Sequence, residues 1–303
     1  MSIAKKMSNI SKDYRSAIRG LFDELEGRIL DRSKLILVLC AAICKHRDAE
    51  KFSGRPEDVH QHVSRITAQG PAEFRSSLSQ VMDLTPGSLV QIVKTLELVA
   101  GSKQGLDTLW DMALQEERQG GDLNRFLSPV VALFCTKIAG LRKSDHALCP
   151  YIASFDFARH VLDVAAQVTI RAQHNLLAGL LLKELFNGPV VIEQENPLER
   201  GFSEEPSPSD FDVILASPPI STKYESVLTD RQLAGFKFKT RHVEGLAIQH
   251  AMHLAKRKAV VLVAPGFTFR TTADERELKR YIVDSGKLEA VVRLPSGSFA
   301  NSN

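Results

Sequence analysis

The first 118 residues place apolar side chains at intervals of three and four positions, which puts them on one face of a helix. The clearest stretch holds Tyr14, Ile18, Leu21, Phe22, Leu25 and Ile29. A continuous apolar run at residues 35–44 predicts a buried helix, and Pro86 suits the first position of another helix with Thr85 as its cap. No strand pattern or repeat interrupts this region, so we expect an all-helical N-terminal domain over residues 1–118.

Between residues 119 and 303, helical patterns alternate with short, continuous apolar runs. The runs are residues 189–193, 211–215, 259–265 and 288–295. Continuous apolar runs are typical of strands that a parallel sheet buries on both faces. The helical patterns are residues 130–138, 156–186, 245–254 and 275–284. This alternation predicts an α/β domain with a mostly parallel sheet, which follows the helical domain.

Composition narrows the functional classes. The chain has 303 residues, of which 44% are hydrophobic and 25% are charged, an ordinary globular balance with room for two domains. The longest apolar run is too short to span a bilayer and no signal peptide opens the chain, so we expect a soluble, cytoplasmic protein. The four cysteines lack metal-ligand spacing, which favours core thiols and no metal site.

The distribution of charge is more informative than its sum. The net charge of +3 is too small to predict a nucleic-acid partner. Residues 149–220 hold 4 basic and 10 acidic side chains, whereas residues 221–303 hold 14 basic and 8 acidic ones. A basic surface of this kind suits a phosphate backbone, and scattered surface charge gives the same count.

The most informative stretch is FDVILASPPI at residues 211–220, an apolar strand that runs into Ser217, Pro218 and Pro219. The two prolines force a rigid, extended exit from the strand. Open α/β sheets place their ligands at such an exit, outside the carboxyl ends of the strands. The exit resembles the catalytic motif of amino-methyltransferases, in which Asn, Asp or Ser precedes Pro-Pro and an aromatic residue. The resemblance implies catalytic roles for Ser217, Pro218, Pro219 and Ile220, with Ile220 in the place of the aromatic ring.

The order of segments over residues 120–303 resembles the modification subunits of type I restriction-modification systems. A helix, a strand ending in Val-x-Pro, a second helix and a Glu-Ala-Val-Val-Arg-Leu-Pro run follow the motif in the family's order. The resemblance implies a Rossmann-like methyltransferase domain over residues 119–303, with S-adenosylmethionine as cofactor. The family continues into a closing hairpin, so we expect the domain to lack its C-terminal end.

Two segments match the family's cofactor pocket in part. Phe126, Ser128 and Pro129 stand where the family has Phe/Tyr-Thr-Pro. Pro150 and Ser154 fit the register of the family's Asp-Pro-x-Cys-Gly-x-Gly loop, but both glycines are replaced. Glycine lets the backbone approach the cofactor closely, so these replacements put binding of S-adenosylmethionine in question.

The family also places an acid against the ribose of the cofactor and an acid against its adenine. Asp163 matches the ribose acid by its spacing to Ala172 and Asn175, whereas Asp156 matches the strand-end position of that acid. The helical pattern over residues 156–186 instead puts Asp163 inside a helix, on solvent. Asn196 stands in the place of the adenine acid, where it offers hydrogen bonds without a charge.

Three functions follow from the resemblance. The first is an active, adenine-specific DNA methyltransferase that works with a specificity subunit or other proteins of a restriction-modification or phage-defence system. The second is a catalytically inactive methyltransferase-fold subunit that binds double-stranded DNA or partner proteins. The missing glycines and the missing aromatic ring favour the second. The third is methylation of an amine in RNA or protein, because Ser-Pro-Pro does not identify the polymer.

Overall fold

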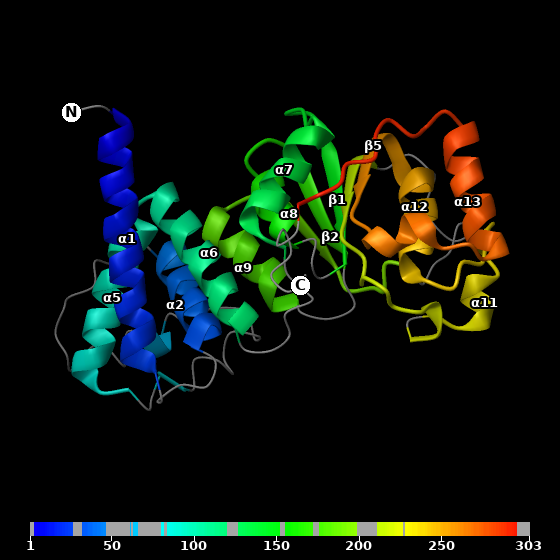
Figure 1. Ribbon diagram of the computed structural model, residues 1–303. Coiled ribbons are helices and arrows are strands. Elements are labelled where there is room, and N and C mark those ends of the chain that lie inside the picture. Colours follow the sequence, from blue (N-terminus) through cyan, green and yellow to red (C-terminus); the bar gives the residue numbers. More distant parts are fainter. Residues whose placement is uncertain are drawn as a thin grey trace. The chain divides into compact units, whose positions relative to one another are not determined.

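The structure, a computed structural model, describes residues 3–26, 32–46, 61, 63–65, 80–81, 84–119, 127–151, 155–171, 176–198, 211–226 and 228–295. The chain divides into two compact units (Figure 1). The first unit comprises Met1–Asp122 together with Leu180–Asn187, and the second comprises Leu123–Gly179 and Gly188–Asn303. Within the described residues, no helix has both the length and the hydrophobicity that a membrane span requires.

The first unit is built from helices α1 (Ile3–Leu25), α2 (Arg32–His46), α5 (Pro86–Ala100) and α6 (Lys103–Gln119), with the second half of α9 (Leu176–Phe186). The buried face of α1 carries Ile18, Leu21, Phe22 and Leu25, as the helical spacing predicts. α5 begins at Pro86, and the Thr85 hydroxyl accepts a hydrogen bond from the Ser88 amide at 3.2 Å, which confirms the predicted cap.

The second unit contains a five-stranded sheet in the order β3-β2-β1-β4-β5, and every pairing in it is parallel. The strands are β1 (His146–Pro150), β2 (Gln167–Arg171), β3 (Val190–Glu193), β4 (Phe211–Ala216) and β5 (Ala255–Val261). Helices α7 (Pro129–Ala139) and α8 (Phe155–Val161) lie on one side of the sheet, and α12 (Val243–Leu254) lies on the other (Figure 1). The predicted fold class, an α/β domain with a parallel sheet, is confirmed.

The single long helix predicted for residues 156–186 is wrong. Three elements occupy this stretch: α8, then β2, then the helix α9. β2 lies between β1 and β3, and Val168, Thr169 and Ile170 are all buried, so both faces of the strand are covered. The apolar residues of β2 fall at helical spacing from those of the flanking helices, so the pattern predicted one helix. The β-branched side chains of Val168, Thr169 and Ile170 favour a strand.

The strand predicted for residues 288–295 is also wrong. The structure gives this stretch no regular secondary structure, and Leu288, Val291 and Val292 are exposed. Glu289 contacts the sheet through an ion pair of 2.7 Å with Lys258 of β5. An extended segment becomes a strand only through ladder hydrogen bonds to a neighbour, and its apolar pattern alone does not provide them. The helix predicted just before it is confirmed as α13 (Ala273–Asp284).

Close packing between α5 and α6 generates a prediction about two glycines of the first unit. A Cβ atom on Gly105 would lie 2.2 Å from the backbone oxygen of Val99, whereas a Cβ atom on Gly87 would meet nothing within 4 Å. We expect Gly105→Ala to lower the free energy of unfolding by about 1–3 kcal/mol, because the helices must move apart. The matched control, Gly87→Ala in α5, should be neutral or stabilise by up to about 1 kcal/mol. Denaturant unfolding of both variants measures the difference, and equal effects would contradict the close contact.

Candidate functional site

The carboxyl ends of the parallel strands meet at one edge of the sheet, where the predicted motif lies. Ser217 follows β4 directly and is buried, as is Pro218, whereas Pro219, Ile220 and Ser221 are exposed. The ladder extends to the last residue of β4, because the Leu262 amide donates to the Ala216 carbonyl at 2.9 Å. The motif therefore begins on the rigid sheet and ends at an exposed tip, with the Ile220 side chain 40% exposed.

The chain turns sharply after the exposed tip. Ser221 adopts a φ of 57°, a left-handed conformation that side chains other than glycine rarely take. The chain then runs antiparallel to the start of α12, where Lys223 pairs with His242 and the Val243 amide donates to the Thr222 carbonyl at 2.9 Å. The exit from β4 is thus held at both ends, by the sheet before it and by α12 after it.

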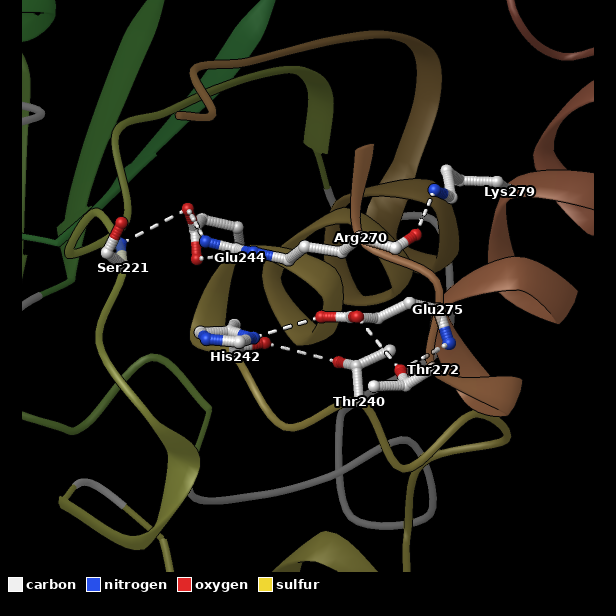
Figure 2. A network of polar contacts seen from close by, with 8 residues as sticks. All are labelled: Ser221, Thr240, His242, Glu244, Arg270, Thr272, Glu275 and Lys279. Atoms are coloured by element: carbon white, nitrogen blue, oxygen red, sulfur yellow. Dashed lines mark hydrogen bonds and ion pairs between the residues drawn. The ribbon is translucent and has the colours of Figure 1, made fainter. Parts of the chain in front are cut away.

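A network of polar side chains lies behind this turn (Figure 2). The Ser221 amide donates to a carboxylate oxygen of Glu244 at 3.2 Å, and Arg270 binds both oxygens of that carboxylate at 3.1 and 3.3 Å. Nδ1 of His242 lies 3.0 Å from a carboxylate oxygen of Glu275. The sequence pattern did not identify these residues, because each lies in a helix start or a loop with no motif around it.

The segment at Ser128 and Pro129 lies beside the start of α8. Ser128 caps α7 by accepting a hydrogen bond from the Val131 amide at 3.3 Å, and Pro129 is the first residue of that helix. The Leu127 amide donates to the buried carboxylate of Asp156 at 2.5 Å. Asp156 lies in the first turn of α8, and its hydrogen bond to Leu127 anchors this segment. Phe126 and Ser154, also predicted as cofactor-binding, lie outside the described residues.

The end of β1 has an unusual conformation. Pro150 is the last residue of the strand, and Tyr151 follows it with a φ of 74° and its amide donating to the Arg171 carbonyl at 2.9 Å. The Tyr151 side chain is buried, and its hydroxyl has no hydrogen-bond partner among the described residues. Burial raises the pKa of Tyr151 far above its usual value, and the nearby Arg171 guanidinium offsets part of this rise. A large residue therefore holds a left-handed turn at the strand end where the family has its glycine loop.

The ends of β2 and β3 carry an ion pair that the sequence did not predict. Arg171, at the end of β2, is buried, and its Nε atom lies 2.7 Å from a carboxylate oxygen of Glu193, at the end of β3. The Glu193 side chain is 33% exposed. The helix predicted over residues 156–186 includes Arg171 and therefore does not place it at a strand end.

Asp163 and Asn196, the remaining predicted residues, take different positions. Asp163 lies between α8 and β2, on the amino side of the sheet, where it pairs with Arg159 at 3.0 Å. It is not brought together with Ser217 or Pro150. Asn196 follows β3 and its side-chain oxygen accepts a hydrogen bond from the Leu198 amide at 3.1 Å, which stabilises its own turn.

Comparisons with known proteins agree with the resemblance seen in the sequence. Residues 177–303 match the family model of N-6 DNA methylases. No curated protein matches the chain. Among solved structures, a protein described as a modification subunit of a type I restriction enzyme from Vibrio vulnificus YJ016 is 16% identical with a TM-score of 0.54, over 93% of this chain and 75% of that one. A protein described as a class I S-adenosylmethionine-dependent methyltransferase from Listeria monocytogenes is 15% identical with a TM-score of 0.50, over 83% and 78%. The TM-scores support the fold, and the family match over residues 177–303 agrees with the resemblance seen in the sequence.

S-adenosylmethionine is the cofactor of this family, and its fit to the strand ends is partial. The ribose hydroxyls need acceptors, and Glu193 supplies a carboxylate whose second oxygen is free of the Arg171 bond. The unpartnered hydroxyl of Tyr151 is a further polar group at the end of β1. Arg171 only donates and therefore does not replace an acid at the end of β2.

The buried hydroxyl of Tyr151 leads to a prediction about stability. A buried hydroxyl without a partner costs about 1–3 kcal/mol, so we expect Tyr151→Phe to raise the free energy of unfolding by about 1 kcal/mol. The Tyr14 hydroxyl accepts a hydrogen bond from Ser102 at 3.0 Å, so the control variant Tyr14→Phe should lower it by a similar amount. Denaturant unfolding measures both. Destabilisation by Tyr151→Phe would mean that the hydroxyl has a partner in solution.

Proposed function

We propose, from the match of residues 177–303 to the N-6 DNA methylase family, that this chain is a DNA methyltransferase subunit. The reaction is transfer of a methyl group from S-adenosylmethionine to the exocyclic amine of adenine. The observation that carries the proposal is the position of Ser217, Pro218 and Pro219 at the carboxyl end of β4, within the matched segment. Ligands of open parallel sheets bind at this edge.

The exit from β4 supplies the acceptors that this chemistry needs. The lone pair of an aromatic amine is delocalised into the ring, which makes the amine a poor nucleophile. The Ser217 hydroxyl oxygen and the Pro218 carbonyl would each accept one amine hydrogen, so that the lone pair turns toward the methyl sulfonium. The bound cofactor would supply the methyl group: its S–C bond would break as the N–C bond forms, S-adenosylhomocysteine would leave, and the amine proton would pass to solvent. Ile220 gives the extruded base apolar contact but lacks aromatic stacking, which is worth about 1–3 kcal/mol per base.

The cofactor would lie over the ends of β1, β2 and β3. The segment with Ser128 and Pro129, anchored by Asp156, borders this region together with Pro150. Phe126, Ser154 and Asn196 keep their predicted cofactor roles in this proposal. Glu193 is a better candidate for the ribose than Asp163, because Glu193 ends a strand at the ligand-binding edge.

The partners that this function implies are double-stranded DNA and the other subunits of a restriction-modification or phage-defence system, in the cytoplasm. A specificity subunit would supply recognition of the target sequence. The surface between the exposed tip and α12 carries Lys223 and Arg241, both exposed, which suits contact with phosphates.

A second candidate function is a methyltransferase-fold subunit without catalysis, which binds DNA or partner proteins. Specific observations favour it: both glycines of the family's loop after β1 are replaced, and the buried Arg171, in place of an acid, ends β2. Both changes remove features with which the family holds its cofactor. Binding of S-adenosylmethionine is therefore the property that separates the two candidates.

Calorimetric titration of S-adenosylmethionine into the purified protein tests this property. We expect binding that Glu193→Gln weakens about tenfold, which corresponds to one lost charge-assisted hydrogen bond. Asp163→Asn is the matched control, an acid paired with an arginine on the amino side of the sheet, and should bind as the wild type does. No binding by folded wild-type protein would exclude the enzyme and leave the second candidate. Equal weakening in both variants would contradict the placement of the ribose.

Rebuilding the family's motif tests the catalytic exit itself. We expect Ser217→Asn combined with Ile220→Phe to increase methyl transfer to DNA about tenfold or more, because the aromatic ring restores stacking on the base. The measurement is incorporation of a labelled methyl group from S-adenosylmethionine into DNA. Ile220→Leu, which changes the side chain without adding a ring, is the control and should leave the rate near that of wild type. A decrease in the rebuilt variant would contradict the role assigned to Ile220.

A further inference from the structure

The left-handed turn at Ser221 requires an interaction that holds it. A left-handed conformation costs free energy for a residue other than glycine. Such a residue persists where the surrounding contacts determine the backbone. The turn has a large consequence, since it sends the chain alongside residues 241–243 at the start of α12 and leaves Pro219 and Ile220 at the exposed tip. Whatever holds Ser221 therefore determines how the motif is presented.

Glu244 makes the side-chain contact to the turn. It lies in the first turn of α12, is completely buried, and accepts the Ser221 amide proton at 3.2 Å. A buried carboxylate needs partners for its charge, and Arg270 provides them through two bonds of 3.1 and 3.3 Å. Figure 2 shows Glu244 between Ser221 and Arg270. A single carboxylate therefore links the turn to Arg270, the residue that follows the 3₁₀ helix Pro265–Phe269.

Arg270 is itself fixed by the structure that follows β5. Its amide donates to the Gly266 carbonyl at 3.1 Å, at the end of the 3₁₀ helix Pro265–Phe269. Its carbonyl accepts a hydrogen bond from Lys279 of α13 at 2.5 Å, and Lys279 also donates to the Thr268 carbonyl. The guanidinium therefore projects from a backbone held by two elements, which restricts where the Glu244 carboxylate can lie.

A second pair supports the start of α12 on the same side. Glu275 of α13 is buried, lies 3.0 Å from His242 and accepts a hydrogen bond from the Thr272 hydroxyl at 2.8 Å. Glu275 thus contacts His242, the residue before α12, but makes no bond to Ser221. It is a comparable buried carboxylate in the same network and therefore a control for the role of Glu244.

We infer that Glu244, charged and held by Arg270, is a positioning residue for the exit Ser217-Pro218-Pro219-Ile220. By accepting the Ser221 amide it fixes the turn that presents Pro219 and Ile220, and it acts on the target base only through that turn. The inference rests on the proposed function for the part that concerns methyl transfer. The contact to Ser221 is testable without it.

Amide hydrogen exchange at Ser221 tests the contact directly. In the double variant Glu244→Leu with Arg270→Met, apolar side chains of similar size replace the buried pair, a change that proteins often tolerate without loss of stability. We expect the Ser221 amide to exchange at least about tenfold faster, which is what one charge-assisted hydrogen bond is worth. The Tyr224 and Val243 amides, which donate to the backbone of the facing segments, should exchange as in wild type. Glu275→Gln should leave Ser221 unchanged.

Unchanged exchange at Ser221 in the double variant, or equally accelerated exchange at Tyr224 and Val243, would overturn the inference. For methyl transfer, we expect the double variant to lower kcat about tenfold or more with KM for S-adenosylmethionine unaltered, because the cofactor position proposed above, over the ends of β1, β2 and β3, does not include the turn. A change in KM alone would overturn the positioning role. A wild-type protein that transfers no methyl group would contradict the proposed function. The exchange result would still decide whether Glu244 positions the turn at Ser221.

Discussion

Five strands that run in one direction bring their carboxyl ends to a single edge of the sheet, and the candidate site depends on this geometry. In parallel strands the peptide groups and the following loops all face the same way, so residues far apart in sequence become neighbours at that edge. Pro150, Arg171, Glu193 and Ser217 meet there because each ends or follows a strand. An antiparallel neighbour would have sent one of them to the opposite side.

The edge divides into two parts with different chemistry. At β4, the motif keeps a hydroxyl, two prolines and a rigid exit, which are the parts that methyl transfer to an amine requires. At β1, both glycines of the family's loop are replaced, and at β2 a buried arginine stands where the family has an acid. Arginine carries a permanent charge, and Glu193 neutralises it across an ion pair of 2.7 Å. The arginine at β2 is thus matched by the acid at β3, which makes the two strand ends one electrostatic unit.

The sequence predicted the elements that have strong local signals. FDVILA, the Ser128-Pro129 helix start and the Thr85 cap each combine hydrophobic pattern with a specific capping or proline effect, and all three have the predicted form. Two predictions failed where tertiary pairing decides the structure. β2 is a strand because β1 and β3 bond to it, and residues 288–295 are not a strand because they form no ladder. The misplacement of Asp163 followed from the first of these errors.

The residues that no pattern identified are those whose role is set by burial. A carboxylate such as Glu244 looks like a surface residue in the sequence, and only the fold shows that it is fully buried against Arg270. A buried ion pair is weak evidence for stability, because apolar residues of the same size often serve as well. What an apolar pair does not provide is an acceptor for the Ser221 amide, and hence the left-handed turn after the motif. The charge is therefore better explained by the shape that it imposes on the exit from β4 than by the free energy that it adds.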